Sequence, residues 1–152
     1  MIIVKKNTVS EIENDPDFCI LVQEYAEECS IDGLPPPVAK MDMYRQLETT
    51  GLFHTFGAYL DDQLVGFITL LISLLPHYST SVAISESYFV GYKYRKTGAG
   101  KFLLQRAEKC AREYEAAGIL VSAPAFGTLS KFLPAVGYRE TNQVFFRRLS
   151  HE

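Results

Sequence analysis

The spacing of apolar residues predicts helices in the first third of the chain and strands after it. The segment "MIIVKK" is rich in β-branched residues and favours a short first strand. Residues 15–30 predict a helix, because apolar side chains recur there at helical spacing: Phe18, Leu21, Val22 and Tyr25. The prolines of "IDGLPPP" interrupt the pattern, and residues 38–51 then predict a second helix that ends at Gly51.

Alternation with a period of two begins at residue 52. The segments "LFHTFGAYL" and "QLVGFITLLISLL" predict an antiparallel hairpin with a tight turn at "DDQ". In the third strand, "VAISESYFV", strict alternation would place four side chains on one face: Ile84, Glu86, Tyr88 and Val90. A long helix over residues 98–118, a buried strand "ILVSAP", a short helix within 126–138 and a last strand "QVFFRRL" follow. The unit from Val82 to Val121 should be a parallel crossover.

Composition narrows the classes of protein that fit this order. A chain of 152 residues suggests one domain over 1–152, and a net charge of −3 argues against a general nucleic-acid binder. No apolar run reaches the roughly 20 residues of a membrane span, and the N-terminus does not resemble a signal peptide. The odd cysteine count and spacing argue against a disulfide framework and a metal site, and reduced thiols fit a cytoplasmic protein: Cys19, Cys29 and Cys110.

The stretch "YRKTGAGKF" combines two glycines with three cations, directly before the long helix. It is not a P-loop, because Arg95 stands at the first glycine position and Phe102 at the hydroxyl position. It is not a dinucleotide loop either, because the third glycine position is Leu103. A glycine turn before a helix N-terminus still favours a diphosphate ligand. The alternative is a plain strand-to-helix turn.

The longer segment "YFVGYKYRKTGAGKFLL" resembles the central motif of the GNAT superfamily, the GCN-type N-acetyltransferases. Arg95, Gly98 and Gly100 occupy the positions of R/Q-x-x-G-x-G/A, and Val90 ends the preceding strand at the expected distance. The order of elements is similar along nearly the whole chain. The resemblance implies an α/β (α+β) fold of GNAT type, with a mixed central sheet of six to seven strands flanked by about four helices.

The resemblance also implies acetyl-CoA as the cofactor and an acyltransferase that acetylates a primary amine directly. The pyrophosphate of acetyl-CoA would be held by the loop backbone together with Arg95. The loop residues are Lys96, Thr97, Gly98, Ala99, Gly100 and Lys101. The pantetheine arm would contact Phe89 and Val90, and Ser122 would line the gap where two strands separate. Glu86 is the candidate general base, acting directly or through water. The alternative for Glu86 is an ordinary solvent-facing carboxylate.

The sequence departs from the family pattern at the general acid. Leu133 stands where relatives often carry a tyrosine, and the usual upstream asparagine is absent. Tyr88 could serve, although a packing role is the alternative. His77 and Tyr78 are candidate acceptor contacts, with a structural role as the alternative.

Several outcomes stay open at this stage. The acceptor could be a small-molecule or a peptide amine. A non-catalytic CoA-binding or protein-interaction module of the same fold is the second hypothesis, and a nucleotide-binding protein is weakened by both failed phosphate motifs. The segment "VFFRRL" could pair at the edge of a second copy, which leaves a homodimer open.

Overall fold

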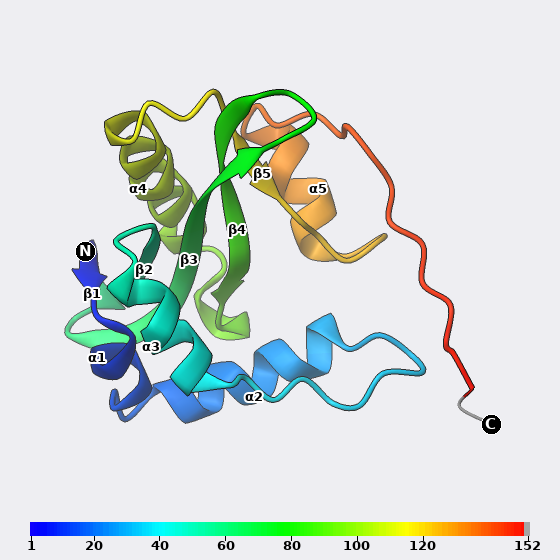
Figure 1. Cartoon of the computed structure of the whole chain (residues 1–152). Coiled ribbons are helices and arrows are strands. Elements are labelled where there is room, and N and C mark those ends of the chain that lie inside the picture. Colours follow the sequence, from blue (N-terminus) through cyan, green and yellow to red (C-terminus); the bar gives the residue numbers. More distant parts are fainter. Residues whose placement is uncertain (151–152) are drawn as a thin grey trace.

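The computed structural model describes residues 1–150 and contains a mixed sheet with strand order β1-β2-β3-β4-β5 (Figure 1). Its antiparallel part consists of β1 (Ile2–Asn7), β2 (Phe53–Leu60), β3 (Gln63–Leu75) and β4 (Thr80–Val90). The edge strand β5 (Ile119–Val121) pairs parallel with β4. The mixed sheet and the parallel crossover are therefore confirmed.

Helices cover both faces of this sheet (Figure 1). They are α1 (Val9–Glu13), α2 (Phe18–Cys29), α3 (Met41–Thr49), α4 (Ala99–Glu113) and α5 (Thr128–Ala135). On one face, Leu103 and Ala107 of α4 pack into the main core beside Ile68. On the other face, Leu21 of α2 packs against Phe67. The apolar face predicted for residues 15–30 and the apolar face of α4 are thus the surfaces that fix these two helices to the sheet.

The hairpin predicted at "DDQ" is confirmed. Asp61 and Asp62 connect β2 to β3, with φ angles of 49° and 63°. Two successive residues with positive φ are typical of a type I′ turn, whose twist matches that of the flanking strands, and Asp tolerates this conformation better than most residues.

A β-bulge in β4 changes which side chains share a face. Thr69 of β3 pairs with Ser87, but its neighbour Leu70 pairs with Ser85, so Glu86 is the extra residue. As a result, Glu86 lies on the α2 side of the sheet, whereas Tyr88 packs against the core on the α4 side. The prediction that Glu86 and Tyr88 share a face was wrong, because strict alternation does not allow for the inserted residue.

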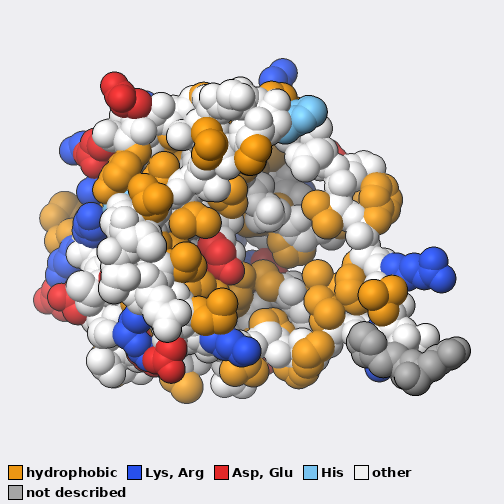
Figure 2. All heavy atoms as spheres, viewed as in Figure 1, with side chains coloured by type: hydrophobic (Ala, Val, Ile, Leu, Met, Phe, Trp, Pro, Cys, Tyr) orange, Lys and Arg blue, Asp and Glu red, His pale blue; other side chains and the backbone are white. Residues whose placement is uncertain are grey.

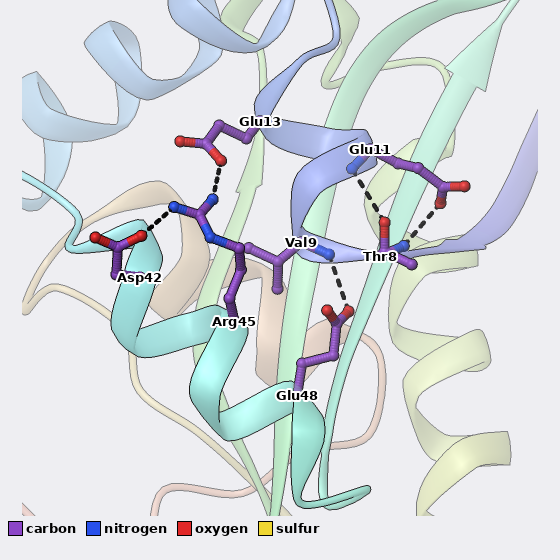
Figure 3. A network of polar contacts seen from close by, with 7 residues as sticks. All are labelled: Thr8, Val9, Glu11, Glu13, Asp42, Arg45 and Glu48. Carbon is purple, nitrogen blue, oxygen red and sulfur yellow. Dashed lines mark hydrogen bonds and ion pairs between the residues drawn. The ribbon is translucent and has the colours of Figure 1, made fainter.

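Helix α1 is absent from the sequence interpretation, although the chain carries a signal for it. Thr8 and Glu11 form a capping box: the Glu11 N–H donates to the Thr8 hydroxyl at 3.1 Å, and the Thr8 N–H donates to the Glu11 carboxylate at 2.7 Å (Figure 3). Arg45 of α3 pairs with Glu13, which ties α3 to α1.

The last predicted strand is not formed. Residues 139–150 have no regular secondary structure, and Val144 and Phe145 are almost fully exposed. The described chain therefore has five strands, not six to seven, and five helices rather than about four. The tail runs along the outside of the molecule toward the loop after α2, where Phe146 and Arg148 pass close to Gly33 (Figure 1).

Candidate functional site

The glycine turn forms a backbone cradle at the start of α4. Gly98 caps the helix with φ of 87°, a conformation that glycine adopts without a steric penalty. A Cβ on Gly100 would lie 2.7 Å from the hydroxyl oxygen of Tyr88, so this position also needs glycine. Within residues 1–150, the N–H groups of Gly98, Gly100 and Lys101 have no hydrogen-bond acceptor. Free N–H groups at the positive end of a 15-residue helix suit an anionic group such as a phosphate.

The remaining predicted cradle residues divide into two groups. Lys96 and Lys101 are exposed beside the turn, and within residues 1–150 neither makes a salt bridge. Thr97 acts inside the turn: its hydroxyl donates to the Tyr94 carbonyl at 2.6 Å and accepts from the Ala99 N–H at 3.3 Å. The two lysines can therefore supply charge to a ligand, while Thr97 shapes the loop.

Arg95 faces away from the cradle. Its Nε donates to the Val90 carbonyl at 3.1 Å, and its guanidinium pairs with Glu28 of α2 and lies over the Tyr92 ring at 4.6 Å. Glu24 of α2 also binds this loop, because its carboxylate accepts from the Tyr92 N–H at 2.9 Å. Residues 91–95 are thus held against α2. The guanidinium of Arg95 is engaged in these contacts, and its role in cofactor binding stays a prediction.

Strands β4 and β5 separate next to the cradle. Their pairing ends at Ser85 and Val121, so β4 continues to Val90 without a neighbour on that side within the described residues. The side chains of Phe89 and Val90 are buried on opposite faces of the sheet. Ser122 is exposed directly after β5, at the point where the strands part. The edge of β4 that β5 leaves unpaired runs from the cradle toward Glu86.

Glu86 is exposed and lines a cavity of about 260 Å³ between the sheet and helices α1, α2 and α3. The Tyr44 hydroxyl donates to its carboxylate at 2.9 Å, and the Tyr44 ring stacks on Phe53 with centroids 5.5 Å apart. Tyr25 lines the same cavity. Burial, followed by the charges of Cys29 and Glu86, raises the pKa of Tyr25 to about 12. Burial and the bond to Glu86 also raise the pKa of Tyr44. Both phenols therefore remain neutral around one carboxylate at physiological pH.

Figure 2 shows this face of the molecule hollowed between the sheet, α2 and the C-terminal tail, with hydrophobic side chains around the hollow. A cradle for an anion and a cavity with a single carboxylate therefore lie at the two ends of one strand segment, 86–90.

Residues 18–127 match the model of the acetyltransferase (GNAT) family, and this range includes β4, the cradle and α4. The chain belongs to the acetyltransferase (GNAT) family. The match confirms the predicted fold type and the acyltransferase class of this GNAT protein. No curated protein shows significant sequence similarity to it.

Solved structures share this GNAT fold at low sequence identity. A ribosomal-protein-alanine N-acetyltransferase from Brucella melitensis biovar Abortus 2308 is 17% identical, with a TM-score of 0.73 over 99% of this chain and 100% of that one. An aminoglycoside antibiotic 6'-N-acetyltransferase from Acinetobacter baumannii is 21% identical, with a TM-score of 0.73 and full coverage of both chains. A transcriptional regulator from Bacillus halodurans C-125 is 15% identical, with a TM-score of 0.74 over 98% of this chain and 100% of that one.

In this GNAT chain, Leu133, which stands where the resemblance implies a tyrosine, is buried in the core. Tyr88 is separated from Glu86 by the sheet, and its hydroxyl packs against Gly100. Burial, together with the nearby Tyr138, raises the pKa of Tyr88. The geometry therefore gives Tyr88 a packing role beneath the cradle and does not place it beside the candidate base.

His77 and Tyr78 lie at the turn between β3 and β4, six residues or more from Glu86 along β4, which corresponds to roughly 20 Å. Neither residue lines the cavity, and their rings contact each other with centroids 5.0 Å apart. This chain's own fold does not bring them to Glu86, so their role as acceptor contacts stays a prediction without support from the geometry.

Tyr44 is the residue of the site that the sequence interpretation missed. It stands in α3 and is the direct hydrogen-bond partner of Glu86. The one aromatic residue of this helix was the available signal, but its partner becomes visible only in three dimensions.

Two further findings concern the described residues as a whole. None of their helices is long and apolar enough to cross a membrane. Within residues 1–150, no group of three or more His, Cys, Asp or Glu side chains is arranged to hold a metal ion.

Proposed function

We propose that this protein transfers the acetyl group of acetyl-CoA to a primary amine, with Glu86 as the general base. One observation carries the proposal: segment 86–90 of β4 has the cavity carboxylate at its start and leads to the free N–H groups of the α4 cradle at its end. A base at one end and an anion site at the other are the two parts that this reaction needs.

The cradle residues fit the diphosphate of acetyl-CoA. The N–H groups of Gly98, Gly100 and Lys101 have no acceptor within the described residues, and the exposed Lys96 and Lys101 add positive charge. The β4 backbone beyond Ser85, which β5 leaves unpaired, can receive the pantetheine arm at Phe89 and Val90. Ser122 would flank that arm at the end of β5.

When bound, acetyl-CoA supplies a thioester that a neutral amine can attack. The residues of the chain then manage the proton. Glu86 accepts the proton that the amine loses, while the neutral Tyr44 donates to the carboxylate and fixes its orientation. N–H groups of the β4 backbone stabilise the negative oxygen that develops during the transfer.

The variant Glu86→Gln tests the base. Loss of a general base lowers kcat by about 10²-fold or more at neutral pH, because such groups contribute roughly 10²- to 10⁴-fold. The loss of kcat should become smaller as the pH approaches the pKa of free alkylamines, since bulk solvent then deprotonates the acceptor. The affinity for acetyl-CoA should be unchanged. The exposed Glu115→Gln is the matched control.

An unchanged kcat in Glu86→Gln would reject Glu86 as the base. A wild type that binds acetyl-CoA but acetylates no amine in a broad acceptor panel would favour the second hypothesis, a non-catalytic module of the same fold.

We also propose a cytoplasmic location and a homodimer. The location is supported by free thiols at Cys19, Cys29 and Cys110. The dimer is supported by the exposed apolar side chains of the tail, Val144 and Phe145, which a second copy could cover.

A further inference from the structure

The cavity lined by Glu86 is mostly apolar and contains one charged side chain, although the proposed reaction brings an amine into it. Aromatic rings from four elements surround it, among them Tyr25 of α2, Tyr44 of α3 and Phe53 of β2. Val38, from the loop before α3, adds a further apolar wall. Glu86 is the one charged residue in the lining among the described residues. The cavity can therefore neutralise a single ammonium group and must surround the rest of the ligand with apolar surface.

Of the acidic residues of α2, Glu27 is exposed and does not line the cavity, and the other two are occupied elsewhere. Glu24 accepts from the Tyr92 N–H, and Glu28 pairs with Arg95, so both carboxylates are occupied in holding the loop before the cradle. Glu86 is itself exposed and offers one carboxylate, so the further ammonium groups of a polycationic acceptor would find no carboxylate partner in the lining. Burial of an unpaired charge is strongly unfavourable. The lining consequently selects against polyamines and aminoglycosides.

The floor of the cavity carries a row of hydroxyl groups across three strands. Ser87, Thr69 and Thr55 are successive cross-strand partners on β4, β3 and β2. The hydroxyls of Ser87 and Thr69 bond to each other at 2.7 Å. Thr55 lines the cavity and is only 3% exposed. Its buried hydroxyl has no hydrogen-bond partner within residues 1–150. Two strand spacings place Thr55 roughly 10 Å from β4, at the far end of the floor.

Thr55 carries the one hydroxyl of this row that has no partner within residues 1–150, and it offers a site for one polar atom of a ligand, because buried polar groups are almost always hydrogen-bonded. Its position also sets a length. A ligand that reaches Thr55 and Glu86 together carries its amine and one further polar group at opposite ends of an apolar body. The volume of about 260 Å³ limits that body to a small one.

We propose that the acceptor is a small arylalkyl primary amine, whose amine lies at Glu86, whose ring lies among Tyr25, Tyr44 and Phe53, and whose distal hydroxyl, where present, bonds to Thr55. This inference rests on the proposed function. In the reaction, an N–C bond forms between the amine and the acetyl carbon, and the C–S bond of acetyl-CoA breaks. The proton that leaves the amine passes to Glu86, and CoA departs as a thiol after taking up one proton.

The test compares tyramine and phenethylamine with kanamycin and spermidine, in thiol-release assays with acetyl-CoA and by calorimetry of each amine with the protein alone. The arylalkylamines should show kcat/KM at least about tenfold above the polycations. Tyramine should exceed phenethylamine by about tenfold or less, the effect of one added hydrogen bond. Thr55→Val, which keeps the shape and removes the hydroxyl, should abolish that preference. Thr128→Val, an exposed threonine at the start of α5, should preserve it.

Equal or better use of the polycations, or a tyramine preference that survives Thr55→Val, would overturn the inference. A protein that binds acetyl-CoA but acetylates neither arylalkylamine also overturns it and leaves the proposed function standing. If acetyl-CoA does not bind, the proposed function fails instead. If acetyl-CoA does not bind, calorimetry of the amines alone still tests which amine the cavity prefers. Tighter binding of tyramine than of spermidine supports the inference, and the reverse order refutes it.

Discussion

At the scale of single residues, the two cradle glycines are required for different physical reasons. Gly98 has a positive φ, whereas Gly100 is limited by the Tyr88 hydroxyl, which would lie 2.7 Å from an added Cβ. Gly98→Ala should therefore reduce the free energy of unfolding by about 1–2 kcal/mol through backbone strain. Gly118, with open space around it and no positive φ, is the control, and Gly118→Ala should change it by less than about 0.5 kcal/mol.

Gly100→Ala should cost about 1–3 kcal/mol through the clash with Tyr88. In a Tyr88→Phe background the clash is removed, so the same change should become neutral or stabilising, since alanine favours a helix over glycine. Urea denaturation of the four proteins measures this coupling. The same cost in both backgrounds would contradict the packing described for Tyr88.

The motif residues were predictable from the sequence because their role depends on local backbone geometry. Gly98 and Gly100 follow from a turn-and-helix pattern that a few residues define. The partner of Arg95 did not follow, because Glu28 is 67 positions away along the chain. The hydrogen bond from Tyr44 to Glu86 is also non-local, because the partners lie 42 positions apart along the chain.

At the scale of elements, the contacts between α2 and the loop at residues 91–95 should be measurable. Arg95→Ala removes a half-buried ion pair and the bond to the Val90 carbonyl, and should lower the free energy of unfolding by about 1.5–3 kcal/mol. Arg112→Ala removes a more exposed pair with Glu108 and should cost less than about 1 kcal/mol. Equal costs in urea denaturation would show that the Arg95 contacts do not hold the loop.

Helix α1 depends on its capping box. Thr8→Ala should destabilise the protein by about 1 kcal/mol, because the Glu11 N–H loses its acceptor (Figure 3). Thr8→Ser keeps the hydroxyl and is the matched control. Thermal unfolding followed by circular dichroism measures both, and an unaltered melting temperature in Thr8→Ala would contradict the role of the cap.

Elements with strong periodicity were predicted well, and the exceptions have local causes. Alternation identified β4 but not its bulge, since one inserted residue leaves the apolar pattern almost unchanged while reversing the facing of Glu86 relative to Tyr88. The segment "QVFFRRL" has a β-rich composition yet forms no strand, because β-composition is realised only when a neighbouring strand provides a partner.

At the scale of the whole molecule, the buried tyrosines predict alkaline instability. Burial raises the pKa of Tyr25 to about 12, and it raises that of Tyr88 as well. An unfolded tyrosine ionises near pH 10. Since the folded pKa lies above the unfolded one, this contribution to stability is complete below about pH 10 and is lost as the pH rises toward 12.

Urea midpoints at pH 9, 10 and 11 should therefore fall with increasing pH, and Tyr25→Phe should make the decline shallower. Tyr78→Phe, at an exposed position, should leave the slope unchanged. Identical slopes for Tyr25→Phe and the wild type would contradict the burial of the Tyr25 phenol.

The order of strands and helices was largely predictable because it follows from periodicity and from turns such as Asp61–Asp62. The cavity was not, since it is formed by side chains from α1, α2, α3 and three strands that only the folded chain brings together. The cradle, unlike the cavity, lies within one continuous segment, so the sequence alone could predict it. The proposed acetyl transfer depends on this cradle.

The most direct test of that account is calorimetry of acetyl-CoA binding to the wild type, to Lys101→Glu and to Lys109→Glu. The two lysines are exposed on α4, but only Lys101 adjoins the cradle. We expect micromolar binding by the wild type, at least about tenfold weaker binding by Lys101→Glu, and binding by Lys109→Glu within about twofold of the wild type. A folded wild type that does not bind acetyl-CoA, or equal weakening by both substitutions, would contradict the account.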